Sequence, residues 1–427
     1  MRSGHHRPRG DEPTDIYVAT NGIDDKNRDG SINEPFQTIQ FAQTQRHSGA
    51  AGVLHVMPGV YRVQNLVTDS SGGPDGRFRI ISEERWQAKI IGTTGGAVWQ
   101  HIGNFTDIEG FEVSAACDSL ATYGIQISGA SNAVKSNHVH HILGGARRSD
   151  GGFLSCGGIG CDMQYDFNDV IGNYIHDIGF FVPTVSAEGI YLSRGLKSFI
   201  HNNIIHRVRG FGFWLYHRPQ AMAICNNLVF NCEIGISIGA KEENLKPDPE
   251  HPDPDYPDGY PPAEGIVVAN NIFLFNKYVG LAEQTAVARD GMVLVGRNSY
   301  LYNYLRGNGP QQIVLHTDGS TENLPHLGGN IEDPGEDIRV PDLFVRYDYD
   351  GYDPVYYKDH PEANSPGEGV DLHPAVGSPL VGAGTIMYPP APSPTDDFDG
   401  NPRNLDSWPM DIGPYVVASH TAGVKGV

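Results

Sequence analysis

The chain has 427 residues and a formal net charge of −21, and it contains 53 glycines and 39% hydrophobic residues. So acidic a chain disfavours nucleic acid or an anionic membrane as a partner, because both require a basic surface. An acidic polysaccharide is compatible with this charge if one groove is locally basic. No run of about 18 apolar residues exists, so the sequence predicts no membrane-spanning helix.

The chain starts with the basic segment MRSGHHRPRG, which lacks the apolar core of a secretory signal. We expect residues 1–14 to be disordered or tag-like. Five cysteines at irregular spacing are too few for a disulfide framework or a zinc motif.

A partial calcium-loop motif follows. Asp25, Asn27 and Asp29 occupy the first, third and fifth positions of a D-x-N-x-D-G pattern. The twelfth position is Phe36 instead of a bidentate glutamate, so we expect Ca²⁺ to bind weakly, if at all. The alternative is a turn that binds nothing. A bound Ca²⁺ would brace this end of the molecule, and we expect no organic cofactor.

The middle of the chain is periodic. Gly189, Gly212 and Gly235 are spaced 23 residues apart, and each opens a short run of alternating apolar residues. The same pattern recurs at longer spacings after Gly124, Gly158 and Gly280. A second run follows each first run about a dozen residues later, so every coil contains at least two short strands. This period predicts an all-β parallel β-helix, with coils over residues 61–305 and long loop insertions.

One asparagine recurs at the start of each second run, as Asn137, Asn173, Asn203, Asn227 and Asn271. We expect these residues to stack at one bend of the coil. Asparagine tolerates a left-handed backbone there, and its amide can hydrogen-bond from one coil to the next.

Both ends of the chain resemble those of a known group of proteins. The opening DIYVATNGIDDKNRDGSINEPFQTIQFAQ and GVLHVMPGVYRV, and the closing DDFDGNPRNLDSWPMDIGPYVV, resemble secreted right-handed parallel β-helix proteins of the pectate-lyase-like superfamily. The resemblance implies an N-terminal capping segment over residues 15–60 with a short helix. It also implies an extracellular or periplasmic protein that acts on carbohydrate. The group contains lyases, glycosidases, epimerases and phage tail spikes.

Aromatic side chains gather on one face of the predicted coils. Counting each glycine as zero, the second residue after it points outward, which gives the column Gln126, Gly160, Tyr191, Trp214, Ser237 and Ala282. Tyr191 and Trp214 in this column, with Tyr216 two residues further on, predict an aromatic platform that stacks on a sugar ring. The alternative is that an insertion covers and buries them.

Charged residues lie beside the platform on four successive coils: Asp162, Arg194, His217, Arg218 and Lys241. A lyase that acts on uronates needs a cation for the carboxylate, a base for the α-proton and a donor for the leaving oxygen. Arg194 or Arg218 would be the cation, His217 or Lys241 the base, and Tyr216 the donor. A solvated row of charges at a turn is the alternative.

A glycoside hydrolase would need two carboxylates about 5 to 9.5 Å apart. Asp162 and Glu188 lie five strand positions apart, which is about 16 Å and too far. Asp162 with Glu242 or with Asp166 stays possible through the loops. We expect Glu188 and Glu242 to contact substrate together with Tyr191 and Trp214.

A histidine column lies on another strand of the coil, where His140, His176 and His206 occupy equivalent positions. Such a column predicts stacked imidazoles on a sheet face, with transition-metal binding as the alternative.

After residue 305 the repeat becomes irregular, and residues 306–427 predict late coils and a loop-rich capping segment of the same domain. The most specific function that the sequence favours is a lyase acting on an acidic polysaccharide by β-elimination. The alternatives are a glycoside hydrolase and a non-enzymatic glycan-binding spike, and the protein would be a monomer or a homotrimer.

Overall fold

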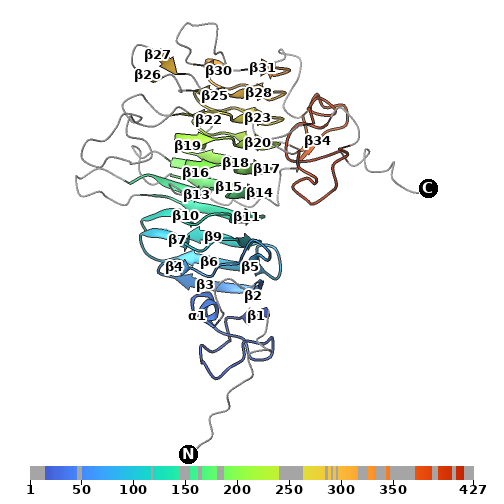
Figure 1. Ribbon diagram of the computed structural model, residues 1–427. Helices are drawn as coiled ribbons and strands as arrows, with labels where there is room; N and C mark the ends of the chain where they lie inside the picture. Colours follow the sequence, from blue (N-terminus) through green and yellow to red (C-terminus); the bar gives the residue numbers. More distant parts are fainter. Residues whose placement is uncertain are drawn as a thin grey trace, which may run out of the picture.

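The computed structural model shows one stack of coils that runs from the N-terminal end to the late strands (Figure 1). It describes residues 15–45, 51–116, 119–144, 154–161, 166–179, 187–239, 263–283, 287–289, 292–294, 297–315, 326–332, 343–346, 371–386, 393–405 and 410–417. No helix of these residues is long and apolar enough to cross a membrane.

Three parallel sheets form the coils, and each is named here by its strands. Sheet A contains β1 (Asp15–Val18), β2 (Gly52–Val56), β5 (Phe78–Ser82), β8 (Thr106–Glu109), β11 (Ala133–Lys135), β14 (Asp169–Ile171), β17 (Phe199–His201), β20 (Ala223–Cys225), β23 (Val267–Ala269), β28 (Ser299–Leu301) and β31 (His326–Gly328). Sheet B contains β3 (Gly59–Val63), β6 (Ala88–Gly92), β9 (Glu112–Ala115), β12 (His138–Ile142), β15 (Tyr174–Ile178), β18 (Ile204–Val208), β21 (Leu228–Phe230), β24 (Ile272–Leu274), β29 (Tyr304–Arg306) and β32 (Ile331–Glu332). Sheet C contains β4 (Leu66–Thr68), β7 (Gly96–His101), β10 (Ala121–Ile127), β13 (Cys156–Cys161), β16 (Ala187–Leu196), β19 (Phe211–Gln220), β22 (Ile234–Ile238), β25 (Val279–Glu283) and β30 (Gln311–Leu315).

Each complete coil therefore has three strands, one more than the two found by pattern. For the glycines from Gly124 to Gly235, the first predicted run is a strand of sheet C and the second is a strand of sheet B. The second run predicted after Gly280 is β28, a strand of sheet A. The third strand lies in sheet A and has only three residues in most coils, as in Ala133–Lys135 and Phe199–His201. Three residues are too few to display an alternating pattern, which is why this strand was missed.

The N-terminal segment closes the first coil. β1 pairs with β2, and α1 (Ile39–Thr44) follows as the short helix that the resemblance implied. The hydroxyl of Thr38 caps α1 by accepting a hydrogen bond from the backbone N–H of Phe41. Ile39 and Ala42 turn inward and bury the apolar side of this helix against the core.

The predicted asparagine column is confirmed as a buried ladder. The Nδ2 of Asn137 donates to the Oδ1 of Asn173 at 3.1 Å, and Asn173, Asn203 and Asn227 repeat this contact toward Asn271 at 2.9 to 3.0 Å. The left-handed backbone, however, belongs to the residue before the ladder asparagine. The ladder residue is selected by its amide, which satisfies buried backbone groups of neighbouring coils.

The recurring glycines sit where the chain passes closest to the core. A Cβ on Gly212 would lie 2.3 Å from the Cγ1 of Val229 and 2.6 Å from the carbonyl oxygen of Gly235. Gly189 has the same surroundings, with Ile205 and the carbonyl of Gly212. Any side chain at these positions would overlap core atoms, so the period of the glycines records the period of the coils.

Two antiparallel pairs lie outside the three sheets: β26 (Val287–Arg289) with β27 (Met292–Leu294), and β33 (Phe344–Arg346) with β34 (Asp371–Pro374). The described part of the C-terminal segment packs on the outer face of sheet B, beside the middle coils (Figure 1). There Phe398, Ile412 and Tyr415 share one buried cluster with Ile204 and Leu228. The outer face of sheet B is thus covered over these middle coils, whereas sheet C is where the sequence placed its candidate site.

Candidate functional site

The outward column of sheet C follows the predicted register. Gln126 pairs with Gly160, Gly160 with Tyr191, and Tyr191 with Trp214, and the column continues through Ser237 to Ala282. Tyr191 and Trp214 are half-buried, whereas Ser237 and Ala282 are buried. Among the described residues, the column is therefore open to solvent over β10, β16 and β19 and closes toward β22.

The ring of Trp214 contacts the other two predicted aromatic rings. The ring centroids of Tyr191 and Trp214 lie 5.6 Å apart, and those of Trp214 and Tyr216 lie 4.6 Å apart. A fourth ring, Phe211, stacks on Trp214 with centroids 4.7 Å apart and planes inclined by only 12°. We call Tyr191, Phe211, Trp214 and Tyr216 the aromatic platform. Tyr191 and Tyr216 are inclined to Trp214 by 53° and 45°, so the half-buried rings offer several apolar faces, and the C–H side of a sugar ring can stack on such a face.

If side chains alternated strictly between the two faces of the strand, the residue before Gly212 would point inward. Phe211 was therefore not predicted as part of the aromatic platform. The direction that a Cβ on Gly212 would take leads into the core, toward Val229, so alternation is interrupted at this residue. The residue before the glycine and the second residue after it consequently share the outer face. The sequence FGFW indicates this arrangement, because an aromatic residue stands at each of these two outward positions, directly before the glycine and two residues after it.

Glu188 occupies the position equivalent to Phe211 on the preceding coil, since the two are paired between β16 and β19. Its side chain is buried, in contrast to the half-buried platform. Its negative charge, after burial itself, is a cause of the raised pKa of the Cys156 thiol. A buried carboxylate thus lies next to the aromatic platform, on the preceding coil. Its predicted contact with substrate stays a prediction.

The predicted cations lie where β16 and β19 lose their regular pairing. Leu192 pairs with Leu215, but Arg194 pairs with Arg218, so β19 has one residue more than β16 between these pairs. This β-bulge places Tyr216 and His217 opposite Ser193. The backbones of Arg194 and Arg218 are consequently neighbours on adjacent coils. Their side chains, and that of His217, are outside the described part of the structure.

Three further predicted residues, Asp162, Lys241 and Glu242, lie outside the described residues. Asp162 directly follows the end of β13 at Cys161, and Lys241 and Glu242 come soon after β22. Their roles stay predictions. Asp166, the alternative partner of Asp162, accepts a hydrogen bond from the backbone N–H of Leu196 at 2.9 Å.

The residues of the predicted calcium loop form a turn stabilised by local hydrogen bonds. An Oδ1 of Asp25 accepts both the backbone N–H and the side-chain Nδ2 of Asn27, at 2.9 and 2.8 Å. Asp29 accepts the backbone N–H of Ser31 at 2.9 Å. The amide of Asn27 thus turns its donor, not its oxygen, toward Asp25. This arrangement fits the turn better than a cage of oxygen ligands, and Ca²⁺ binding stays a prediction.

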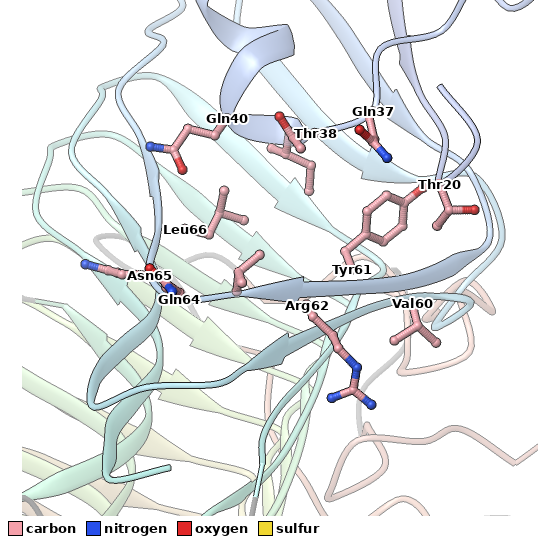
Figure 2. Close-up of a pocket in the computed structure, with 12 residues that line it drawn as sticks. Thr20, Gln37, Thr38, Gln40, Val60, Tyr61, Arg62, Gln64, Asn65 and Leu66 are labelled. Carbon is pink, nitrogen blue, oxygen red and sulfur yellow. The ribbon is translucent and has the colours of Figure 1, made fainter. Parts of the chain in front are cut away.

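A separate pocket of about 630 Å³ lies at the N-terminal end, between α1 and the β3–β4 corner (Figure 2). Tyr61 and Gln37 line it together with Gln64 and Asn65, and none of its lining residues is an acid or a histidine. Burial raises the pKa of Tyr61 to about 12, and its hydroxyl donates to the carbonyl of Met57. The pocket therefore lacks the acid and base that the predicted reaction needs.

The comparisons with known proteins agree with the architecture. A family model described as "Right handed beta helix region" matches residues 96–246. The structure of pectate lyase Pel9A is 14% identical, with a TM-score of 0.52 over 94% of this chain and 96% of its own. A rhamnogalacturonan lyase is 12% identical, with a TM-score of 0.53 over 78% of this chain and 91% of its own. A search of curated protein sequences finds no significant match.

These findings define the fold of the chain. It is a right-handed parallel β-helix, as the sequence predicted. At such low identities the likeness to solved structures extends to the fold alone.

Proposed function

We propose that the protein is a polysaccharide lyase that cleaves a uronate-containing glycan by β-elimination on the outer face of sheet C. The observation that carries the proposal is the contiguous aromatic platform, which directly precedes the paired arginine positions on the same two strands. The same fold occurs in a pectate lyase and a rhamnogalacturonan lyase, so it is compatible with lyase chemistry.

The spacing of the coils suits a glycan. Adjacent strands of a parallel sheet lie about 4.8 Å apart, which is close to the length of one sugar unit. A chain lying across β10, β13, β16 and β19 would place successive sugars over successive coils. Tyr191 and Trp214 would then stack on neighbouring units, next to Tyr123, whose ring occupies the space over Gly160.

The proposed roles follow from what β-elimination requires. Arg194 or Arg218 neutralises the uronate carboxylate and thereby acidifies the α-proton. His217 or Lys241 removes that proton, and Tyr216 donates a proton to the leaving oxygen as the glycosidic bond breaks. Asp162 would orient one of the cations. The β-bulge supports this assignment, because it brings Tyr216 and His217 together opposite a single residue of β16.

We further propose that the protein acts outside the cytoplasm, in the extracellular space or the periplasm, because its substrate would be a polymer found there. A monomer would present the sheet C face without further assembly.

The test is to incubate the purified protein with a panel of uronate and neutral polysaccharides while measuring ultraviolet absorbance and reducing ends in parallel. An unsaturated uronide absorbs in the ultraviolet, so absorbance that rises together with reducing ends supports β-elimination. Reducing ends without absorbance would identify a glycoside hydrolase instead. If neither signal appears across the panel but glycan binding does, the protein is a glycan-binding spike.

Variants separate chemistry from binding. His217→Ala and Lys241→Ala should identify the base, with kcat falling by roughly 100- to 10,000-fold in one of them while glycan affinity persists. Trp214→Ala should instead raise KM and weaken binding. Lys277→Ala is a matched control, because Lys277 is an exposed lysine that contacts Glu233 at 3.5 Å and precedes β25, two coils beyond β19. Unchanged turnover in both base variants would overturn the assignment of the base.

A further inference from the structure

A second group of potential ligands lies on the outer face of sheet B. Glu112 on β9 and His138 and His140 on β12 each place one ligand atom within 4.8 Å of the other two. Glu112 and His138 are paired between the strands, and Val113 and Val139 beside them point into the core. Alternation therefore turns all three ligand residues outward.

Hydrogen-bond partners assign the tautomer of His138. Arg207 binds both carboxylate oxygens of Asp177, at 2.7 and 2.8 Å, and the Nδ1 of His176 lies 2.5 Å from the Oδ2 of Asp177. A carboxylate only accepts, so the Nδ1 of His176 carries the proton and its Nε2 carries a lone pair. The Nε2 of His138 lies 2.7 Å from the Nε2 of His176 and must therefore donate a hydrogen bond to it. The Nδ1 of His138 is then left with the lone pair that a metal ion needs.

His140 and Glu112 are arranged in a similar way. The Nδ1 of His140 lies 2.5 Å from the Nδ1 of His141, while its Nε2 lies 3.5 Å from the Oε1 of Glu112. The other oxygen of Glu112, Oε2, accepts from the ammonium of Lys89 at 2.7 Å. In each of the three residues one polar atom is engaged by a supporting side chain. The second atoms of His140 and Glu112 face each other, so a metal ion bound between them would replace their direct contact. Residues outside the ligand set orient metal ligands in this way at known sites.

We propose that Glu112, His138 and His140 bind a divalent transition-metal ion of the zinc class, with water in the fourth position. Two imidazoles and one carboxylate with an open position are a known ligand set for such ions. Tetrahedral ligands at 2.0 to 2.2 Å from a metal lie about 3.4 Å apart, so the 3.5 Å between His140 and Glu112 already fits. The side chains of His140 and Glu112 are 15% and 18% exposed, which gives the ion a path from solvent.

The stack of imidazoles that the sequence predicted is also present, and it supports this site. His140 and His176 stack with centroids 5.3 Å apart, and His176 and His206 stack at 5.0 Å. His206 is bound by the hydroxyl of Tyr174 at 2.7 Å and lies two coils beyond His140. The column thus has a ligand end near Glu112 and a structural end at His206, whose ring stacks on Phe230.

The test uses full-length protein stripped with a chelator and dialysed. Because the sequence contains His5 and His6, a background variant with both replaced by alanine removes adventitious binding there. Calorimetry with Zn²⁺ should show one equivalent bound per chain. Co²⁺ should produce the visible bands of a four-coordinate ion at the same stoichiometry.

His140→Phe should weaken Zn²⁺ binding by more than about 100-fold, because it removes a ligand. The loss of a residue that only orients a ligand lowers metal affinity by roughly 10- to 100-fold. Glu112→Gln, which preserves shape, should weaken it by at least about tenfold. The matched control is His206→Phe, because Phe230 already occupies the next position of that column. This variant should bind Zn²⁺ as the background does. Circular dichroism without metal verifies that each variant is folded.

Absence of stoichiometric binding by the folded background protein would overturn the proposal. So would equal affinity in the background protein and in folded His140→Phe. Neither result would affect the proposed lyase activity, because Glu112 and the two histidines lie on sheet B and the platform lies on sheet C.

Discussion

At the scale of single residues, buried amides connect the coils. The Nδ2 of Asn203 donates to the carbonyl of Val170 at 2.8 Å and to the Oδ1 of Asn227 at 3.0 Å. Its Oδ1 accepts the backbone N–H of Asn173 at 2.9 Å. Each of these groups is shielded from water, so the amide is the partner that keeps them hydrogen-bonded.

Asn203→Ala should lower the free energy of unfolding by about 3 kcal/mol or more, because it leaves several buried backbone groups without partners. Urea denaturation followed by circular dichroism measures the change. Asn104→Ala is the matched control, since exposed Asn104 accepts one backbone N–H, from Ala130. It should cost about 1 kcal/mol. Equal losses in the two variants would contradict the role of burial.

At the scale of the elements, the sheet C strands from β10 to β22 have an interruption that sequence periodicity alone does not reveal. The glycine that opens the run is directed at the core, so outward residues lie on both sides of it. In β19 this adds Phe211 to the platform, and the later bulge moves Arg218 opposite Arg194. The candidate site is shaped by these two departures from alternation.

Gly212→Ala should destabilise the protein by about 2 to 3 kcal/mol, because the new methyl group overlaps Val229 and the carbonyl of Gly235. Thermal melting measures the effect. In the control Gly328→Ala the added carbon would meet only the Cδ2 of Leu301, at 3.4 Å. That contact is ordinary, so melting should change little. A neutral Gly212→Ala would mean that the coils can separate locally at no cost.

At the scale of the whole molecule, burial of histidines links stability to pH. Desolvation lowers the pKa of His101 to about 4 and that of His201 to about 3. The unfolded chain binds protons to these groups from about pH 6.5 downward, whereas the folded chain does not. Stability is therefore fully present above pH 6.5 and is lost as the pH falls toward the folded pKa values.

The urea midpoint should accordingly decrease between pH 6.5 and 4. His101→Gln should flatten this dependence, because it removes one group that titrates only in the unfolded state over that interval. His101 changes the free energy of unfolding by on the order of 3 kcal/mol between the two ends of this pH interval. If the urea midpoint of His101→Gln depended on pH as that of the natural chain does, burial of His101 would not be a cause of the acid sensitivity.

Local regularities made much of the molecule predictable. Three features repeat with the coil: the glycine spacing, the asparagine column and the outward column through Tyr191 and Trp214. A correct assignment of one coil therefore predicts the equivalent positions in the others. The short sheet A strands and the bulge carry no repeating pattern, and neither was predicted. The ligand set of Glu112, His138 and His140 was missed because its members come from two coils of unequal length.

The sequence by itself determined the parallel β-helix, its asparagine ladder and the aromatic column, because each depends on contacts between equivalent residues of neighbouring coils. Only the tertiary structure decided which side chains outside that repeat meet. The described C-terminal segment packs on the middle coils of sheet B. A series of hydrogen bonds from Arg207 through Asp177 and His176 sets the tautomer of His138. Such contacts join residues far apart along the chain, where loop lengths and side-chain packing decide the distance and periodicity does not.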